Sequence, residues 1–81
     1  MSAEKLYVMS ATCDQARTYA ESKGVSGPTG LRWINRAEYM RGLRDIELHV
    51  LPTARRIPEF WYLMELAAAQ NFKIIKVSRD K

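Results

Sequence analysis

The chain has 81 residues, of which 47% are hydrophobic and 27% charged, a composition typical of one globular domain rather than of a disordered chain. Cys13 is the only cysteine and His49 the only histidine, which excludes an intramolecular disulfide and a cysteine-based zinc site. Lysine and arginine number 13 against 9 acidic residues, giving a net charge of +4. This excess favours anionic partners, although solubility alone can account for it.

The sequence holds no apolar run of membrane-spanning length, and residues 1–5 are polar rather than typical of a secretion signal. We therefore expect a cytoplasmic protein. A single domain of this length is only marginally stable alone, which leaves a homodimer open.

The first predicted unit is a strand over residues 5–10 followed by a helix that begins after Thr12. Thr12 and Gln15 match a capping box, in which two otherwise unpaired amides are satisfied reciprocally. Gly24 is expected to end this helix, because glycine adopts the left-handed conformation without strain. Residues 24–30 then hold three of the four glycines, which predicts a flexible loop.

The middle of the chain predicts a second strand over residues 31–34 and a short helix after it. Asn35 with Glu38 resembles a cap that opens this helix, and Gly42 is expected to end it. Three residues are expected on its inward side: Tyr39, Met40 and Leu43.

A third strand is predicted over residues 46–51, a mostly apolar run that Pro52 ends. Pro58 is predicted to be the first residue of a second long helix, because a first helical position needs no backbone N–H. The residues expected on its apolar face are Ile57, Phe60, Leu63, Met64 and Ala67.

Asn71 is expected to terminate the second long helix in a left-handed conformation. Residues 72–77 predict the last strand, in which Lys73 and Lys76 interrupt the apolar run as they would near a sheet edge. Residues 78–81 are expected to be a frayed tail.

Strands that alternate with helices predict an α/β fold with a mostly parallel sheet, because parallel neighbours need a crossover connection. We expect a minimal three-layer Rossmann-like or flavodoxin-like sandwich over residues 1–81, with about four strands, two main helices and one short helix. Residues 35–45 are barely long enough for a crossover, so the pairing of the second and third strands stays open.

In open α/β sheets, ligands bind beyond the carboxyl ends of the strands, where helix N-termini offer free amides. Three of the four loops at that rim carry arginine, so we expect it to be electropositive. Its candidate partner- or anion-binding residues are Ser10, Thr12, Asn35, Arg36, Thr53, Arg55, Arg56 and Arg79. Arg55 and Arg56 suit phosphate or carboxylate best, although a plain solvated loop explains them equally simply.

Trp33, Trp61 and Tyr62 supply more aromatic mass than a small core requires. At least one is a candidate exposed aromatic that marks a partner surface, with core packing as the alternative.

No catalytic residue, cofactor or metal is expected. The turn after the first strand has neither glycine nor lysine, so it matches neither a P-loop nor a dinucleotide fingerprint. Cys13 and His49 have no sequence partner that would make them a nucleophile or a general base, and structural roles explain both.

Residues 31–57 combine a tryptophan-containing strand, the segment YMRGLRD at 39–45, and the run ELHVLPTARRIP from residue 47. This pattern resembles small α/β proteins encoded by tailed bacteriophages. The resemblance implies a Rossmann-like fold and a phage source, with a bacterial host cytoplasm as the compartment, but it implies little about activity.

The leading hypothesis is a small non-enzymatic binding protein, phage-derived, that engages an acidic or phosphate-bearing partner through the arginine-bearing rim. That partner would be a host protein, as for an inhibitor or adaptor. One alternative is a nucleic-acid-binding module, for which affinity falls steeply with salt. Another is a nucleotide- or anion-binding enzyme that uses the turn after the first strand.

Overall fold

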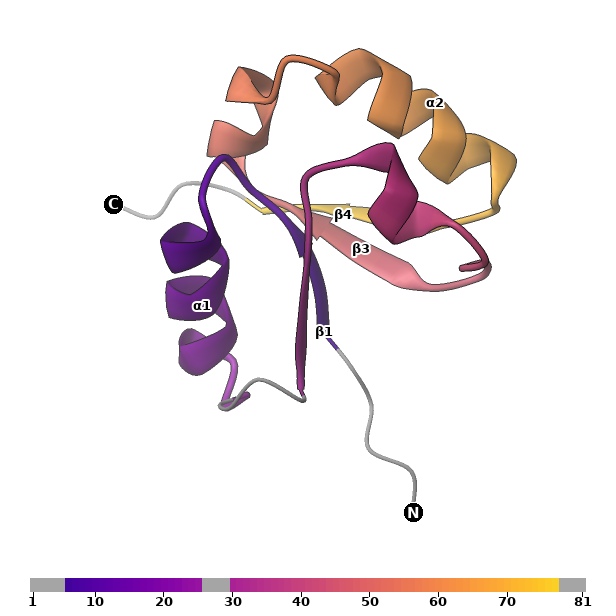
Figure 1. The fold of residues 1–81 in the computed structure, drawn as a ribbon. Helices are drawn as coiled ribbons and strands as arrows, with labels where there is room; N and C mark the ends of the chain where they lie inside the picture. The colour runs from indigo at the N-terminus through magenta and orange to yellow at the C-terminus, as the bar shows by residue number, and fades with distance from the viewer. Residues whose placement is uncertain (1–5, 26–29, 78–81) are drawn as a thin grey trace.

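Strands and helices alternate along the chain as the sequence predicts (Figure 1). The computed structural model describes residues 6–25 and 30–77. Its elements are β1 (Leu6–Met9), α1 (Cys13–Ser22), β2 (Leu31–Ile34), the 3₁₀ helix η1 (Ala37–Met40), β3 (Glu47–Val50), the 3₁₀ helix η2 (Pro52–Arg56), α2 (Phe60–Ala69) and β4 (Lys73–Lys76). Most of the predicted loop at 24–30 and the predicted tail at 78–81 lie outside the described residues.

The four strands form one parallel sheet in the order β2-β1-β3-β4. The predicted α/β class, Rossmann-like or flavodoxin-like, is therefore confirmed. The open question about the second and third strands is also answered, because β1 lies between them and they do not pair. β1 is paired on both sides, with Tyr7 beside Arg32 of β2 and beside Leu48 of β3.

Helices cover both faces of the sheet, but unequally (Figure 1). α1 packs on β1 and β2 at one face, whereas α2 lies over the other face, where it packs on β4, η1 and η2. Strand order reverses at β1, and right-handed crossovers that run in opposite directions place their helices on opposite faces. We call the two sides the α1 face and the α2 face.

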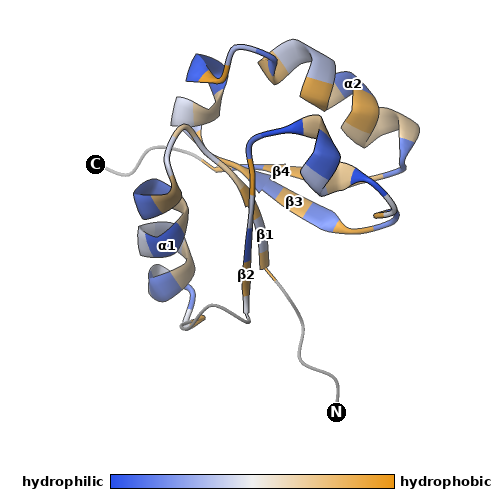
Figure 2. Ribbon diagram, in the orientation of Figure 1, coloured by the Kyte–Doolittle hydropathy of each residue, from blue (hydrophilic) through white to orange (hydrophobic). Residues whose placement is uncertain are grey.

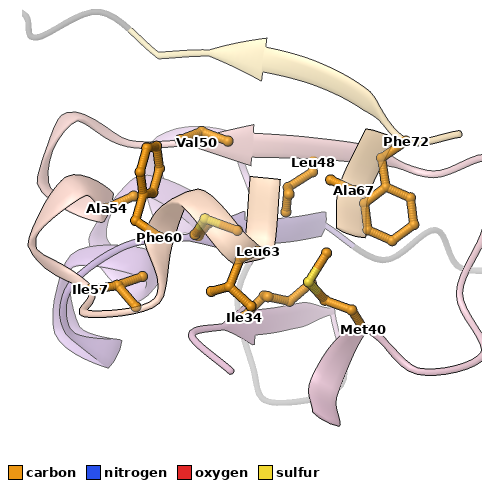
Figure 3. Close-up of a cluster of buried hydrophobic side chains, with 11 residues drawn as sticks. Ile34, Met40, Leu48, Val50, Ala54, Ile57, Phe60, Leu63, Ala67 and Phe72 are labelled. Carbon is orange, nitrogen blue, oxygen red and sulfur yellow. The ribbon is translucent and has the colours of Figure 1, made fainter. Parts of the chain in front are cut away.

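The main hydrophobic core lies on the α2 face (Figure 3). Leu48 and Val50 of β3 point toward Leu63 and Phe60 of α2, because alternate residues of a strand share a face. The buried cluster consists of Met9, Ile34, Met40, Leu48, Val50, Ala54, Ile57, Phe60, Leu63, Ala67 and Phe72. Figure 2 shows the corresponding pattern, with hydrophobic residues along the strands and α2 and hydrophilic residues over much of α1.

Three predicted helix boundaries are confirmed by the local backbone. Thr12 and Gln15 form the predicted capping box, with the Gln15 N–H donating to Thr12 Oγ1 and the Thr12 N–H donating to Gln15 Oε1, each at 3.2 Å. Gly24 follows α1 with φ of +82°, and Asn71 follows α2 with φ of +62°. Both are the left-handed terminators that the sequence predicts.

The second long helix begins at Phe60, so its predicted start at Pro58 is wrong by two residues. Ile57 is extended, with φ of −69° and ψ of 127°, because the ring of a following proline disfavours helical geometry at the residue before it. The 3₁₀ helix η2 instead occupies Pro52–Arg56. The first, third and last strands are each one residue shorter at both ends than predicted.

The predicted cap at Asn35 is also wrong. η1 begins at Ala37, the capping position is Arg36, and no side chain caps it. Met40 is buried as predicted, but Tyr39 is 50% exposed. A 3₁₀ helix repeats every three residues, so Ala37 and Met40 share the inward side and Tyr39 points away from it.

Candidate functional site

The turns that follow β1 and β3 are joined by a hydrogen-bond network at the point where strand order reverses. The Thr53 hydroxyl donates to Gln15 Oε1 at 2.7 Å and accepts from the Ala11 N–H at 3.3 Å. The capping box uses the N–H groups of Thr12 and Gln15. Three amides that would offer an anion a cradle after β1 therefore already have partners within the protein.

Ser10 is fully buried at the end of β1. Its hydroxyl donates to the Thr12 carbonyl at 2.7 Å, and its own carbonyl accepts from Trp33 Nε1 at 3.1 Å. These contacts fix the turn between β1 and α1 and hold Trp33 partly buried against it. Ser10 thus lies in the interior of the rim, whereas Trp33 remains partly exposed.

The structure separates the predicted rim arginines into different environments. Arg36 and Arg56 line a hollow of about 620 Å³ together with Asn35, Glu38 and Glu59. The buried Asn35 Oδ1 has no hydrogen-bond partner among the described atoms. Two carboxylates line this hollow beside the two arginines, so its charge does not specifically favour an anion.

A larger hollow of about 710 Å³ lies beside α1 and over the β3–β4 half of the α1 face. Apolar residues from the ends of β3 and β4 form much of its surface, namely Leu51, Ile75 and Val77. Lys23 from the end of α1, Arg56 from η2 and Lys76 from β4 also line it. We call this hollow, with its three basic side chains, the cationic groove.

Among residues 6–25 and 30–77, no carboxylate lines the cationic groove. Across these described residues, the one pair of opposite charges is Arg17 with Asp14 at 3.4 Å, and the other close pair is His49 with Glu47 at 3.8 Å, which is ionic only when His49 is protonated. Neither pair involves a basic residue of the groove. Lys23 Nζ instead lies 5.5 Å from the centre of the Tyr19 ring, near enough for a cation–π contact. In the described part of the chain, the groove therefore combines three basic side chains with an apolar floor and no lining carboxylate.

Tyr19 joins the groove to the only histidine. Its hydroxyl lies 2.6 Å from His49 Nδ1, and His49 Nε2 faces Glu47 Oε1 at 3.8 Å. Burial lowers the pKa of His49, a shift that nearby Lys23 reinforces and Glu47 opposes, and burial raises the pKa of Tyr19. We therefore assign a neutral imidazole that accepts from the tyrosine hydroxyl, and both groups are uncharged at neutral pH.

The three candidate exposed aromatics have different positions. Trp61 is 71% exposed and Tyr62 is 53% exposed, and both belong to α2. Trp33 is partly buried. Trp61 lines a third hollow of about 450 Å³ together with Arg55 and Lys76, so Arg55 belongs to this site and not to the cationic groove.

The remaining chemical groups give no separate site in the described part of the chain. Cys13 is a free, partly buried cysteine in the first turn of α1. No group of three or more His, Cys, Asp or Glu side chains that could hold a metal ion occurs between residues 6 and 77, leaving aside 26–29. Neither α1 nor α2, the helices of that same range, has the length and apolar character needed to cross a membrane.

Sequence reasoning placed Thr53 and Arg56 at the rim but missed Lys23 and Lys76. Lys23 follows a helix and Lys76 interrupts a strand, so each has an ordinary local explanation. Only the sheet order brings them to one groove. Arg79 lies outside the described residues.

Comparison of the chain with protein-family models, with curated proteins and with solved structures gives no match in any of the three.

Proposed function

We propose that this chain is a small non-enzymatic binding protein that engages an acidic or phosphate-bearing partner through the cationic groove. The observation that carries the proposal is the presence of Lys23, Arg56 and Lys76 along one hollow whose lining, within the residues that the structure describes, includes no carboxylate. Opposite charge lowers the cost of bringing the two surfaces together and speeds their encounter. The phage resemblance adds the second part of the proposal, a host protein as partner.

The form of the groove favours a protein segment over a small anion. Small-anion sites use converging donors such as free helix amides, but Thr53 and the capping box occupy amides of the β1–α1 turn. The groove instead offers separated cations and an apolar floor that includes Ile75. An acidic segment with apolar side chains matches both properties.

Tyr19 and His49 support a binding role more than a catalytic one. A general base works best with a pKa near the working pH, whereas burial moves the pKa of His49 below its ordinary value. Burial moves the pKa of Tyr19 upward, away from an anionic nucleophile. Their mutual hydrogen bond instead holds α1 against β3.

The experiment compares two double variants that remove the same charge. Lys23→Gln with Arg56→Gln removes two of the groove's cations, whereas Arg41→Gln with Arg44→Gln removes two that do not line it. The probes are a fluorescently labelled polyglutamate peptide and a labelled single-stranded oligonucleotide of the same net charge. Binding of both probes is measured by fluorescence anisotropy at low and at physiological salt.

We expect the groove variant to bind the polyglutamate peptide about tenfold more weakly than the wild type, since a hydrogen bond to a charged group contributes about 1.5 to 3 kcal/mol. The matched variant should bind nearly as the wild type does. Equal losses in the two variants would show that net charge alone attracts the peptide and would remove the groove from the proposal.

Two results would support the alternatives instead. Preferential, strongly salt-dependent binding of the oligonucleotide would favour a nucleic-acid-binding module. A rise in melting temperature with one compound of a nucleotide panel would favour a nucleotide-binding enzyme, because a ligand that binds only the folded state stabilises it.

A further inference from the structure

β4 is an edge strand whose outer backbone groups have no partner strand in the described sheet. On its inner side, the Lys73 N–H donates to the Ile46 carbonyl at 2.8 Å and the Val77 N–H donates to the Val50 carbonyl at 3.0 Å. Backbone groups of alternate residues point to opposite sides of a strand. The N–H and C=O groups of Ile74 and Lys76 therefore point away from β3, toward the open edge.

The third hollow, of about 450 Å³, lies beside this edge between β4 and α2. Phe60, Trp61 and Met64 line it from α2, and Lys76 and Val77 line it from the end of β4. The Trp61 ring packs edge-on against Phe60, with ring centres 4.9 Å apart at 73°. Trp61 is thus held in place although 71% of it is exposed. We call this hollow the Trp61 hollow.

We propose that β4 receives an added strand from a partner protein, in the form of an extended segment that carries acidic side chains two positions before and after an apolar one, so that all three share a face. The segment's backbone pairs with the outward groups of Ile74 and Lys76, an apolar side chain enters the Trp61 hollow, and carboxylates face Lys76 and Arg55. Strand addition supplies affinity through main-chain hydrogen bonds and specificity through pockets for alternate side chains. The acidic character of the segment rests on the proposed function, whereas the edge and the hollow are independent of it.

Charge argues against a second copy of this chain as the added strand. Lys73 and Lys76 are both exposed on β4, so two β4 strands side by side would gather four lysines along one seam. Like charges across paired strands are destabilising, and edge lysines are a known way of preventing self-association. Lys73 has Glu47 beside it in the register, whereas Lys76 and Arg55 form no ion pair in the described part of the chain.

Two substitutions of Lys76 separate its backbone from its charge. Lys76→Gln removes the charge alone. Lys76→Pro also removes the outward N–H, which β3 does not use, and proline is accepted on an edge strand when its N–H would face solvent. Thermal melting of both variants checks that they remain folded. The probe is the tightest peptide selected by the wild-type protein from a random dodecapeptide library, with affinity measured by fluorescence anisotropy.

We expect the selected peptides to carry acidic residues two positions from an apolar one and the Lys76→Pro variant to bind about tenfold more weakly than Lys76→Gln, since the lost bond leaves a peptide carbonyl unpaired. In nuclear magnetic resonance spectra, the amides of Ile74 and Lys76 should become protected from exchange when the peptide binds. Equal affinities for the two variants, unchanged amide exchange at these residues, or a selection that yields no binding peptide would overturn strand addition.

The Trp61 hollow has a matched control on the same helix. Trp61→Ala removes a wall of the hollow, whereas Tyr62→Ala removes an exposed aromatic that does not line it. Only Trp61→Ala should weaken the selected peptide. Equal effects of the two variants would overturn the role of the hollow, and a dimer that Lys76→Pro dissociates in analytical ultracentrifugation would overturn the choice of occupant.

The strand-addition proposal and the proposed binding role of the cationic groove can be tested independently. Lys23 and Arg56 line the groove but not the Trp61 hollow, and Trp61 lines the hollow but not the groove. If Trp61→Ala and Lys76→Pro weaken the peptide while Lys23→Gln with Arg56→Gln does not, strand addition stands without the groove. The reverse pattern would leave the groove as the binding site and overturn strand addition.

Discussion

The two faces of the sheet differ in how completely they are covered. On the α2 face, Leu48 is fully buried and Val50 is 8% exposed beneath α2. On the α1 face, where α1 packs on β1, Val8 is fully buried and Ala16 and Ala20 of α1 are buried too, but His49 and Ile75 are only partly buried. One face is therefore a closed core, and the other is closed over β1 and β2 only.

This difference shows how a short chain can use one face of its sheet for the hydrophobic core and leave part of the other face accessible for binding. The buried cluster lies where α2, η1 and η2 meet the sheet, and apolar burial of this kind stabilises by about 25 cal/mol per Å². Strand order reverses only once, which leaves α1 as the single described helix on its face. The β3–β4 half of that face is consequently accessible, and there the cationic groove lies.

The largest expected effect comes from matched truncations on the two faces. Leu48→Ala should lower the free energy of unfolding by about 2 to 5 kcal/mol, because it leaves a cavity in a closed core. Ile75→Ala on β4 should cost about 1 kcal/mol, since solvent already reaches its side chain. Urea denaturation measures both changes. Equal losses would show that the α1 face is as closed as the α2 face and would break the comparison.

An intermediate effect is expected at Thr53, which links the turns at the carboxyl ends of β1 and β3. Thr53→Ala removes the acceptor of the Ala11 N–H and the donor to Gln15, so the free energy of unfolding should fall by about 1 to 2 kcal/mol. Thr53→Ser keeps the hydroxyl and is the control. Chemical denaturation that gave the same stability for both variants would contradict the role of the hydroxyl.

The smallest effect is a pH dependence from His49 on the partly covered face. Burial lowers its pKa in the folded state below the ordinary value of 6.5, so the unfolded chain binds the proton more tightly. This stability contribution is complete above pH about 6.5 and is lost as the pH falls toward the folded-state pKa. Denaturation at pH 7.5 and 5.5 should show the loss in the wild type and a smaller one in His49→Gln. An equal loss in both would assign it to other groups.

The sequence predicts the elements of this fold better than their arrangement. Hydrophobic period, the Thr12 capping box and the terminators Gly24 and Asn71 are local signals, so they locate strands and helix ends within one or two residues. The position of β1 between β2 and β3 depends on long-range pairing, for which local patterns carry no information. The 3₁₀ form of η1 and η2 was also missed, because a single turn has too few residues to show a period.

The candidate site was predictable only in part, for a related physical reason. The rule that ligands bind at the carboxyl ends of parallel strands led to Thr53 and Arg56, which line the cationic groove. Ser10 was predicted on the same rim, but its side chain is buried and its carbonyl accepts a hydrogen bond from Trp33, which was predicted only as a candidate exposed aromatic. Lys23 and Lys76 lie far apart in the chain and become neighbours of one groove only through the fold.

The interior position of β1 also has a kinetic consequence. Leu6 pairs with Leu31 and Tyr7 with Leu48, so the first strand of the chain pairs only with strands that are distant in the sequence. Because the described strands are all parallel, the sheet cannot begin to form from a β-hairpin. Proteins dominated by such non-local pairings lose loop-closure entropy before stabilising contacts form, and they fold more slowly than helical bundles of equal length. Before residues 47–50 pair with β1 during folding, only elements that are close in the sequence can cover Val8 and Met9. Of these elements, α1 is the one best able to form early, because Thr12 caps it.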